Sequence, residues 1–202
     1  MKNAAYIQDY LNGMRQITER VSQQAIDDVI EALFEVYRRE NTIWIAGNGG
    51  SASTATHFAC DLVKATISPG RPRLRAFALA DNIPLVSALT NDDGWEAIYL
   101  EQLRSFFRAG DAVVGISVHG GSGRDRAGAW SQNLLRALEF AKQNGGVAIG
   151  LAGFDGGAMK DICDYCIVVP YDTTPHVESY HVAIHHLIAF CLAEKIEQTA
   201  PR

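Results

Sequence analysis

The sequence contains no long apolar run, no excess of basic residues and no glycine-, proline- or serine-rich linker. No apolar stretch approaches the roughly 20 residues that a helix needs to cross a bilayer, so we expect no membrane partner. The formal net charge is −5. Since nucleic-acid binding normally rests on a basic face, a nucleic-acid partner is not expected either. Without a linker, the 202 residues are predicted to form one domain, 1–202.

Cysteine is scarce, and the sequence begins without a signal-peptide core. These features predict a cytoplasmic protein with reduced thiols. Cys163 and Cys166 have the CxxC spacing, but there is no second pair. We therefore interpret them as small buried hydrophobic residues and not as a zinc site.

Helical periodicity covers residues 3–40, and the sheet core is expected over 42–202. Within this core, apolar strand-like runs alternate with helical patterns, at 42–46, 74–79, 112–116, 147–151 and 166–169. This alternation predicts an α/β fold: a three-layer α/β/α sandwich around a parallel, flavodoxin-like sheet of about five strands, with an N-terminal helical extension. Ligands of such folds bind at the carboxyl ends of the strands.

The first expected strand is followed by Gly47-Asn48-Gly49-Gly50-Ser51 and then by a helical segment. Glycines allow a close backbone approach to an anion, and the N-terminus of a helix favours a phosphate group. His57 and Asp61 lie four residues apart on the following helix, and so on one face. An imidazole and a carboxylate in this arrangement suit a metal site or proton transfer.

A second glycine-rich loop carries Ser117, His119 and Ser122 after the third expected strand. Hydroxyl and amide groups of this kind can surround phosphate oxygens. Neither loop has the Walker or the GxGxxG spacing, which disfavours nucleotide binding. Together the two loops indicate a small phosphorylated substrate.

The last helix carries Glu178, His181, His185 and His186. Glu178 and His186 are eight residues apart, and either His185 or His186 could face a site with His57 and Asp61. The residues alone leave this choice open. For any one of these histidines taken alone, a hydrogen-bonded structural role is the default interpretation.

Several short motifs occur together: residues 47–51, His57-Phe58-Ala59, Asn91-Asp92, Gly110-Asp111, residues 153–157 and the helix with His181 and His186. In this combination the chain resembles the bacterial phosphoheptose isomerases of the sugar-isomerase (SIS) domain family. The resemblance implies a cytoplasmic homotetramer, with active sites at subunit contacts, that interconverts sedoheptulose 7-phosphate and D-glycero-D-manno-heptose 7-phosphate. It also implies one Zn²⁺, or another divalent metal, per subunit.

By the same resemblance, the metal ligands are His57, Asp61, Glu178 and His186. For the isomerisation we expect Asp61 to act as the catalytic base and His186 as its acid partner. Substrate contacts are implied at Asn48, Gly49, Gly50, Ser51, Asp92, Ser117, His119, Ser122 and Glu178. Three positions depart from the family pattern. Asp61 replaces a glutamate, Glu178 replaces a glutamine, and His119 stands where the family has a serine. The substrate is therefore expected to differ from the usual one in some respect.

Two alternatives remain. One is a non-catalytic SIS-domain protein, which binds a replication initiator or senses a phosphosugar. The other is an isomerase of a different phosphosugar, for example in natural-product synthesis.

Overall fold

The structure is a computed structural model, and it describes residues 2–121 and 131–199. Five strands form one parallel sheet in the order β2-β1-β3-β4-β5. Their bounds are β1 Thr42–Gly47, β2 Arg75–Ala78, β3 Ala112–Ser117, β4 Val147–Gly153 and β5 Tyr165–Val169. Each lies within a few residues of an expected strand, because buried parallel strands are continuous apolar runs.

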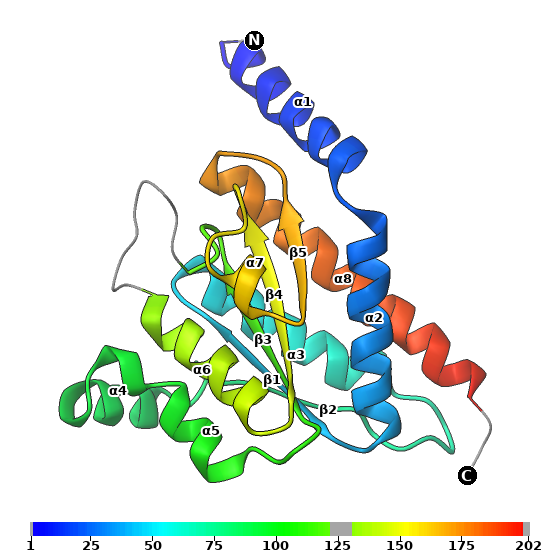
Figure 1. The fold of residues 1–202 in the computed structure, drawn as a ribbon. Coiled ribbons are helices and arrows are strands. Elements are labelled where there is room, and N and C mark those ends of the chain that lie inside the picture. The colour runs from blue at the N-terminus through cyan, green and yellow to red at the C-terminus, as the bar shows by residue number, and fades with distance from the viewer. Residues whose placement is uncertain (1, 122–130, 200–202) are drawn as a thin grey trace.

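Helices cover both faces of this sheet (Figure 1). One face carries α2 Gln23–Arg38, α3 Gly50–Ala65 and α8 Thr174–Gln198. The other carries α4 Ile83–Asp92, the 3-10 helix η1 Trp95–Ala97, α5 Leu100–Phe106, α6 Gln132–Gln143 and α7 Met159–Ile162. The predicted three-layer sandwich is confirmed. Among the described helices, none is both long and apolar enough to cross a membrane.

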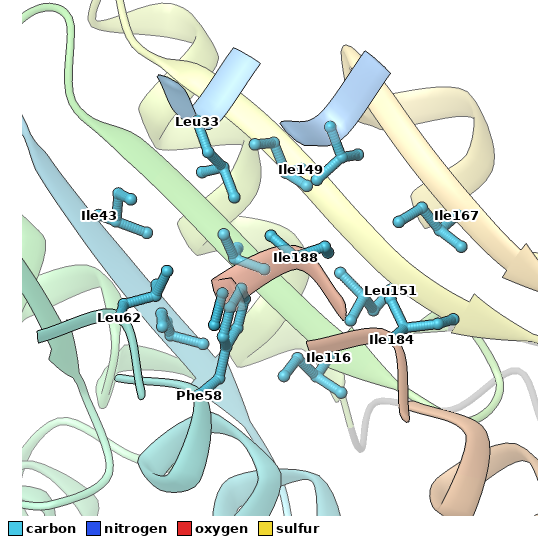
Figure 2. Close-up of a cluster of buried hydrophobic side chains, with 14 of the residues drawn as sticks. Leu33, Ile43, Phe58, Leu62, Ile116, Ile149, Leu151, Ile167, Ile184 and Ile188 are labelled. Atoms are coloured by element: carbon cyan, nitrogen blue, oxygen red, sulfur yellow. The ribbon is translucent and has the colours of Figure 1, made fainter. Parts of the chain in front are cut away.

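The core on the α8 side holds the site's two main helices in place (Figure 2). Phe58 and Leu62 of α3 meet Ile184 and Ile188 of α8 above the strands, and all four side chains are buried. Burial of each such side chain contributes roughly 1.5–3 kcal/mol. The two helices are therefore fixed side by side, and polar residues at their margins have defined positions.

The strand order places a switch point between β1 and β3. After β1 the chain turns into α3 on one face, whereas after β3 it leads to α6 on the other face. In open parallel sheets the ligand crevice lies at such a point, beyond the carboxyl ends of the two strands. Both predicted phosphate loops, 47–51 and 117–121, begin there.

The N-terminal helix α1, Ala4–Arg20, projects beyond the sheet (Figure 1). Its Tyr6, Ile7 and Leu11 side chains are exposed. It contacts the main body at the first turns of α8, where the Tyr10 ring stacks on His176 with a centroid distance of 4.3 Å. The Tyr10 hydroxyl also lies 2.7 Å from Ser179 Oγ. α1 is thus docked at its middle, while its apolar N-terminal half lacks cover from this subunit's described residues.

Candidate active site

A pocket of ≈ 240 Å³ lies at the carboxyl ends of β1 and β3. Its described lining residues are Asn48, Ser51, Ile116, Ser117, Val118, His119, Gly121, Ser131, Leu134, Thr174 and Glu178. Five of the expected substrate-binding residues are therefore brought together: Asn48, Ser51, Ser117, His119 and Glu178. Ser122 lies outside the described residues.

The first loop, residues 47–51, positions the start of α3 beside the pocket. Gly49 has φ +57°, a conformation that side chains other than glycine rarely adopt. A Cβ on Gly47 would lie 2.3 Å from the Ser51 carbonyl oxygen, so only glycine allows this tight turn. The N-terminus of the 16-residue α3, with its partial positive charge, therefore borders the pocket.

The Glu178 carboxylate lies at this same helix end. A Cβ on Gly50 would lie 2.7 Å from Glu178 Oε1, so the absence of a side chain at Gly50 makes room for the carboxylate. The α3 dipole favours a negative charge there. Gly50 therefore makes room for the Glu178 side chain. Glu178 is one of the residues that line the pocket.

Buried side chains support the first loop from behind. The Tyr99 hydroxyl donates a hydrogen bond to the Gly47 carbonyl oxygen. Burial raises the pKa of Tyr99 to about 12, against the opposing effect of that bond, so the hydroxyl remains protonated as the donor at neutral pH. Asn48 is held by the buried amide of Asn133. The loop is therefore preorganised.

The second loop is equally constrained. Gly120 and Gly121 have φ +61° and +85°. The Gly121 N–H donates to Ser117 Oγ at 3.1 Å, which fixes that hydroxyl at the pocket. His119 follows on the wall, with its ring against Phe154 at a centroid distance of 4.3 Å.

A second feature lies further along α3 and α8. One nitrogen of His57, His185 and His186 and one oxygen of Asp61 all lie within 4.8 Å of one another. Asp61 Oδ2 is 3.6 Å from His57 Nε2, 3.6 Å from His185 Nδ1 and 3.4 Å from His186 Nε2. The two exposed imidazole nitrogens, Nε2 of His57 and Nε2 of His186, are 3.4 Å apart.

The four distances of 3.4–3.6 Å are those of ligands around a tetrahedral divalent cation. Ligands bound at 2.0–2.2 Å to a tetrahedral zinc lie about 3.3–3.6 Å from each other. Asp61 Oδ2 and both ring nitrogens of His185 are buried and have no hydrogen-bond partner among the described residues. Such atoms are costly to bury unless a ligand or ion satisfies them. The residues present therefore fit a metal ion.

The protonation state of His185 agrees with that role. Burial, and then the neighbouring His186 and His57, lower its pKa to about 4, against the opposing effect of Asp61. The imidazole is thus neutral at neutral pH, as a metal ligand must be.

The cluster differs from the expected ligand set at one position, because it contains His185 in place of Glu178. Glu178 lies seven residues before His185 on α8, which is about 10 Å along the helix axis. Its carboxylate sits beside the start of α3, two turns before His57. The choice between His185 and His186 also resolves differently than expected, since both belong to the cluster.

Asp92 is another difference. It is exposed at the end of α4, a helix with no buried residues, and its carboxylate accepts a hydrogen bond from Asn91. It is not among the residues that line the pocket. Its role as a substrate contact stays a prediction.

Sequence reasoning did not identify Asn133, and it left His185 as an open alternative to His186. His185 lies in the buried stripe of α8 with Val177, His181, Ile184 and Ile188. A histidine within such a stripe needs a partner, and this signal was present in the spacing. Asn133 is likewise a polar residue on the buried side of α6, together with Leu134, Ala137 and Leu138.

Comparison with known proteins adds independent information. Residues 5–152 match the SIS domain family. The chain is 40% identical over 191 residues to lincomycin biosynthesis protein LmbN of Streptomyces lincolnensis, covering 93% of this chain and 68% of that protein. It is 35% identical over 196 residues to a phosphoheptose isomerase of Aneurinibacillus thermoaerophilus, covering 95% and 94%. The structure of phosphoheptose isomerase GmhA from Neisseria gonorrhoeae superposes with a TM-score of 0.82 at 26% identity, covering 96% and 97%.

Proposed function

Since the chain belongs to the SIS-domain family, we propose that it is a metal-dependent aldose–ketose isomerase of a phosphorylated sugar. The preferred reaction converts sedoheptulose 7-phosphate into D-glycero-D-manno-heptose 7-phosphate. One observation carries this proposal: the polar pocket and the cation cluster lie on the same two helices. Gly50 precedes His57 by seven residues on α3, and Glu178 precedes His185 by seven on α8.

This spacing suits a sugar phosphate. Seven residues of helix correspond to about 10 Å, which is about the extended length of a seven-carbon sugar phosphate. The phosphate group would bind at the loops with Ser51 and Ser117, beside the N-terminus of α3. The C1–C2 end of the substrate would then lie near the cluster.

At the cluster, His57, Asp61, His185 and His186 would hold one divalent ion per subunit, with zinc preferred for this nitrogen-rich set. When bound, such an ion polarises carbonyl and hydroxyl oxygens. Asp61 turns Oδ2 toward the three histidines. Its other carboxylate oxygen, Oδ1, is the atom we assign as general base.

The proton transfers balance within the substrate and these two side chains. Asp61 takes the proton from C1 of the ketose, and the C1–H electron pair becomes the double bond of an enediol. His186, when it is protonated and released from the ion, would give a proton to the C2 oxygen and take one from the C1 hydroxyl. Asp61 then returns its proton to C2, which yields the aldose without any co-reactant.

The test is a turnover assay with a panel of phosphorylated ketoses, including sedoheptulose 7-phosphate, with and without a chelator. We expect turnover of at least one of these substrates, and a loss of more than about 100-fold in His57→Ala and after chelation. Undiminished turnover in His57→Ala would contradict the metal-dependent mechanism. No turnover of any ketose, together with tight binding of a protein, would favour a non-catalytic SIS-domain protein.

A second candidate is isomerisation of a different phosphosugar in natural-product synthesis. Its support is the 40% identity with a lincomycin biosynthesis protein, together with His119 and Glu178 in the pocket. The same substrate panel distinguishes the two candidates, because a longer or differently substituted ketose phosphate would then have the higher kcat/KM.

The proposal extends to a cytoplasmic homotetramer with active sites at subunit contacts. Its support is the exposed apolar half of α1 and the half-exposed His57 and His186, which leave room for a second subunit over the cluster.

A further inference from the structure

The strand β2 is an outer strand of the sheet, and among the described strands it pairs with β1 alone (Figure 1). The Leu79 N–H, just after β2, donates to the Ile45 carbonyl oxygen of β1 at 2.9 Å. Because backbone groups alternate in direction along a strand, the N–H and C=O of Ala76 point away from β1. The outer side of β2 therefore offers backbone hydrogen-bonding groups to a further strand.

One face of this strand is exposed at three alternate positions. Arg73, Arg75 and Phe77 are exposed, whereas Leu74 and Ala76 between them are buried in the core beneath α3. Successive side chains of a strand point to opposite faces of the sheet. The three exposed residues therefore form one row on the face that carries α5. We call this row, together with the neighbouring Phe106 of α5, the β2 edge surface.

Two aromatic rings make one end of the β2 edge surface apolar. Phe77 is 54% exposed, and Phe106, the last residue of α5, is 58% exposed. Both rings stack on Trp44, at centroid distances of 5.4 and 6.1 Å. The Trp44 indole N–H donates to the buried Asp111 carboxylate at 2.9 Å, which fixes the ring that supports the other two. Neighbouring exposed apolar groups, unlike single ones, mark interaction sites.

The other end of the surface is basic, although the protein carries a formal net charge of −5. Neither Arg73 nor Arg75 forms an ion pair within the described part of the chain. Arg75 donates a hydrogen bond to the Glu40 carbonyl oxygen at 3.5 Å. Arg71, by contrast, donates to two carbonyl oxygens at the end of α8 and has a structural role. Two guanidinium groups are therefore available to carboxylates.

These features discriminate between possible occupants. Two copies of the chain that met through this edge would bring the arginines of both copies close together, and like charges disfavour that contact. Charged residues on an edge strand often serve only to prevent such pairing. The exposed rings beside them, however, add an apolar contact that protection of the edge does not require. Nucleic acid could use the charge and the rings but not the unpaired strand edge. An acidic polypeptide in extended conformation uses all three.

We propose that the β2 edge surface is a docking site for an extended acidic segment of a partner protein. The segment adds as a strand beside β2. Two of its carboxylates, spaced two residues apart so that they share one face, contact Arg73 and Arg75. An apolar side chain of the segment packs on Phe77 and Phe106.

This docking site is separate from the candidate active site. Arg75 begins β2 at the amino ends of the strands, whereas the pocket lies at the carboxyl ends of β1 and β3. The inference is therefore independent of the proposed function.

The experiment measures peptide binding to the purified full-length protein by fluorescence anisotropy. The probe is a labelled peptide of about ten residues. It has threonine at alternate positions and, between them, glutamates followed by valines. A second peptide has lysine in place of glutamate. Two further forms carry N-methyl groups on one or the other alternate set of backbone amides. A labelled single-stranded oligonucleotide of the same length is the last probe.

Two variants test the contacts on the protein. Arg73→Glu/Arg75→Glu reverses both charges, and Phe77→Thr removes one ring but keeps a residue that favours strands. The matched control is Arg20→Glu/Lys160→Glu, which makes the same change in net charge at two exposed positions on α1 and α7. Circular dichroism and urea unfolding check that each variant is folded.

We expect saturable binding of the acidic peptide to the wild type and none of the lysine peptide. The charge-reversal variant should weaken binding at least about tenfold, Phe77→Thr about three- to tenfold, and the control less than about twofold. One N-methylated form should lose binding while the other retains it, because only one edge of an added strand faces β2.

Absence of saturable binding of the acidic peptide would overturn the proposal, and so would equal binding by the lysine peptide or by the charge-reversal variant. Equal affinities of the two N-methylated forms would overturn strand addition. Tighter binding of the oligonucleotide than of the peptide would show that the surface recognises nucleic acid instead. Since the assay contains no sugar phosphate, none of these outcomes bears on the proposed isomerase.

Discussion

Asn48, which lines the pocket, exchanges two side-chain hydrogen bonds with the buried Asn133. Nδ2 of Asn48 donates to Oδ1 of Asn133 at 3.0 Å, and Nδ2 of Asn133 donates back at 2.9 Å. Oδ1 of Asn133 also accepts from the Leu134 N–H. The pair ties the turn after β1, which leads into α3, to the first turn of α6 on the other face of the sheet.

We predict that Asn133→Ala lowers the free energy of unfolding by about 1–3 kcal/mol, because it leaves the Asn48 amide without its partner. Urea unfolding measures this. In the same variant kcat/KM should fall, since Asn48 loses its fixed orientation. Asn144→Ala is the control, as Asn144 is exposed at the other end of α6, and it should change stability by no more than about 0.5 kcal/mol. Equal effects of the two substitutions would contradict the role of Asn133.

A second prediction separates the two possible ligand sets. His185→Leu should reduce bound metal to well below one ion per subunit, because it removes a cluster ligand. Glu178→Ala should leave the metal content unchanged, because Glu178 lies at the pocket and not in the cluster. Elemental analysis after equilibration with zinc measures both. Loss of metal in Glu178→Ala with retention in His185→Leu would restore the ligand set expected from the sequence.

The third prediction concerns pH. Burial lowers the pKa of His181 to about 4, although its hydrogen bond to the Ala152 carbonyl oxygen acts in the opposite direction. The unfolded chain, with a histidine pKa near 6.5, binds more protons between pH 6.5 and 4. Stability is therefore fully present above pH 6.5 and is lost as the pH falls, by about 2–3 kcal/mol near pH 4.5.

Urea unfolding at several pH values compares the wild type with His181→Gln, which keeps a donor for Ala152. The variant should lose less stability on acidification by about that amount. Parallel curves for the two proteins would show that His181 does not contribute to the acid sensitivity.

The fourth prediction concerns assembly. Replacement of Ile7 and Leu11 by lysine should reduce the mass of the assembly in light scattering, because it places charges on the exposed apolar half of α1. Gln16→Lys, on an exposed position of the same helix, should leave the mass unchanged. An unaltered mass in the double variant would exclude this face from the subunit contact.

Much of the fold follows from the sequence alone. The five strands were found because buried parallel strands are continuous apolar runs. Ser22 is a residue type that favours the N-cap position, and its side chain accepts a hydrogen bond from the Ala25 N–H at the start of α2. The meeting of the two loops also followed, since the carboxyl ends of parallel strands share one edge of the sheet.

Only part of the cation cluster could be predicted from the sequence. Helical periodicity places His57 beside Asp61, but it says nothing about how far α8 is shifted along α3. That shift is set by core packing around Phe58 and Ile184, and it brings His185 level with Asp61 while Glu178 stays level with Gly50. Asn133 was not predicted either, because its partner Asn48 lies 85 residues away in the sequence.

The contact between α1 and α8 links the exposed N-terminal helix to the pocket. His176 receives the ring of Tyr10 and also stacks against Tyr171. On the same turns of α8, Thr174 and Glu178 line the pocket. Since α1 and the pocket contact the same turns of α8, a neighbour bound to α1 that shifts these turns would change the affinity of the pocket for its ligand, and the ligand would change the affinity for the neighbour by the same factor.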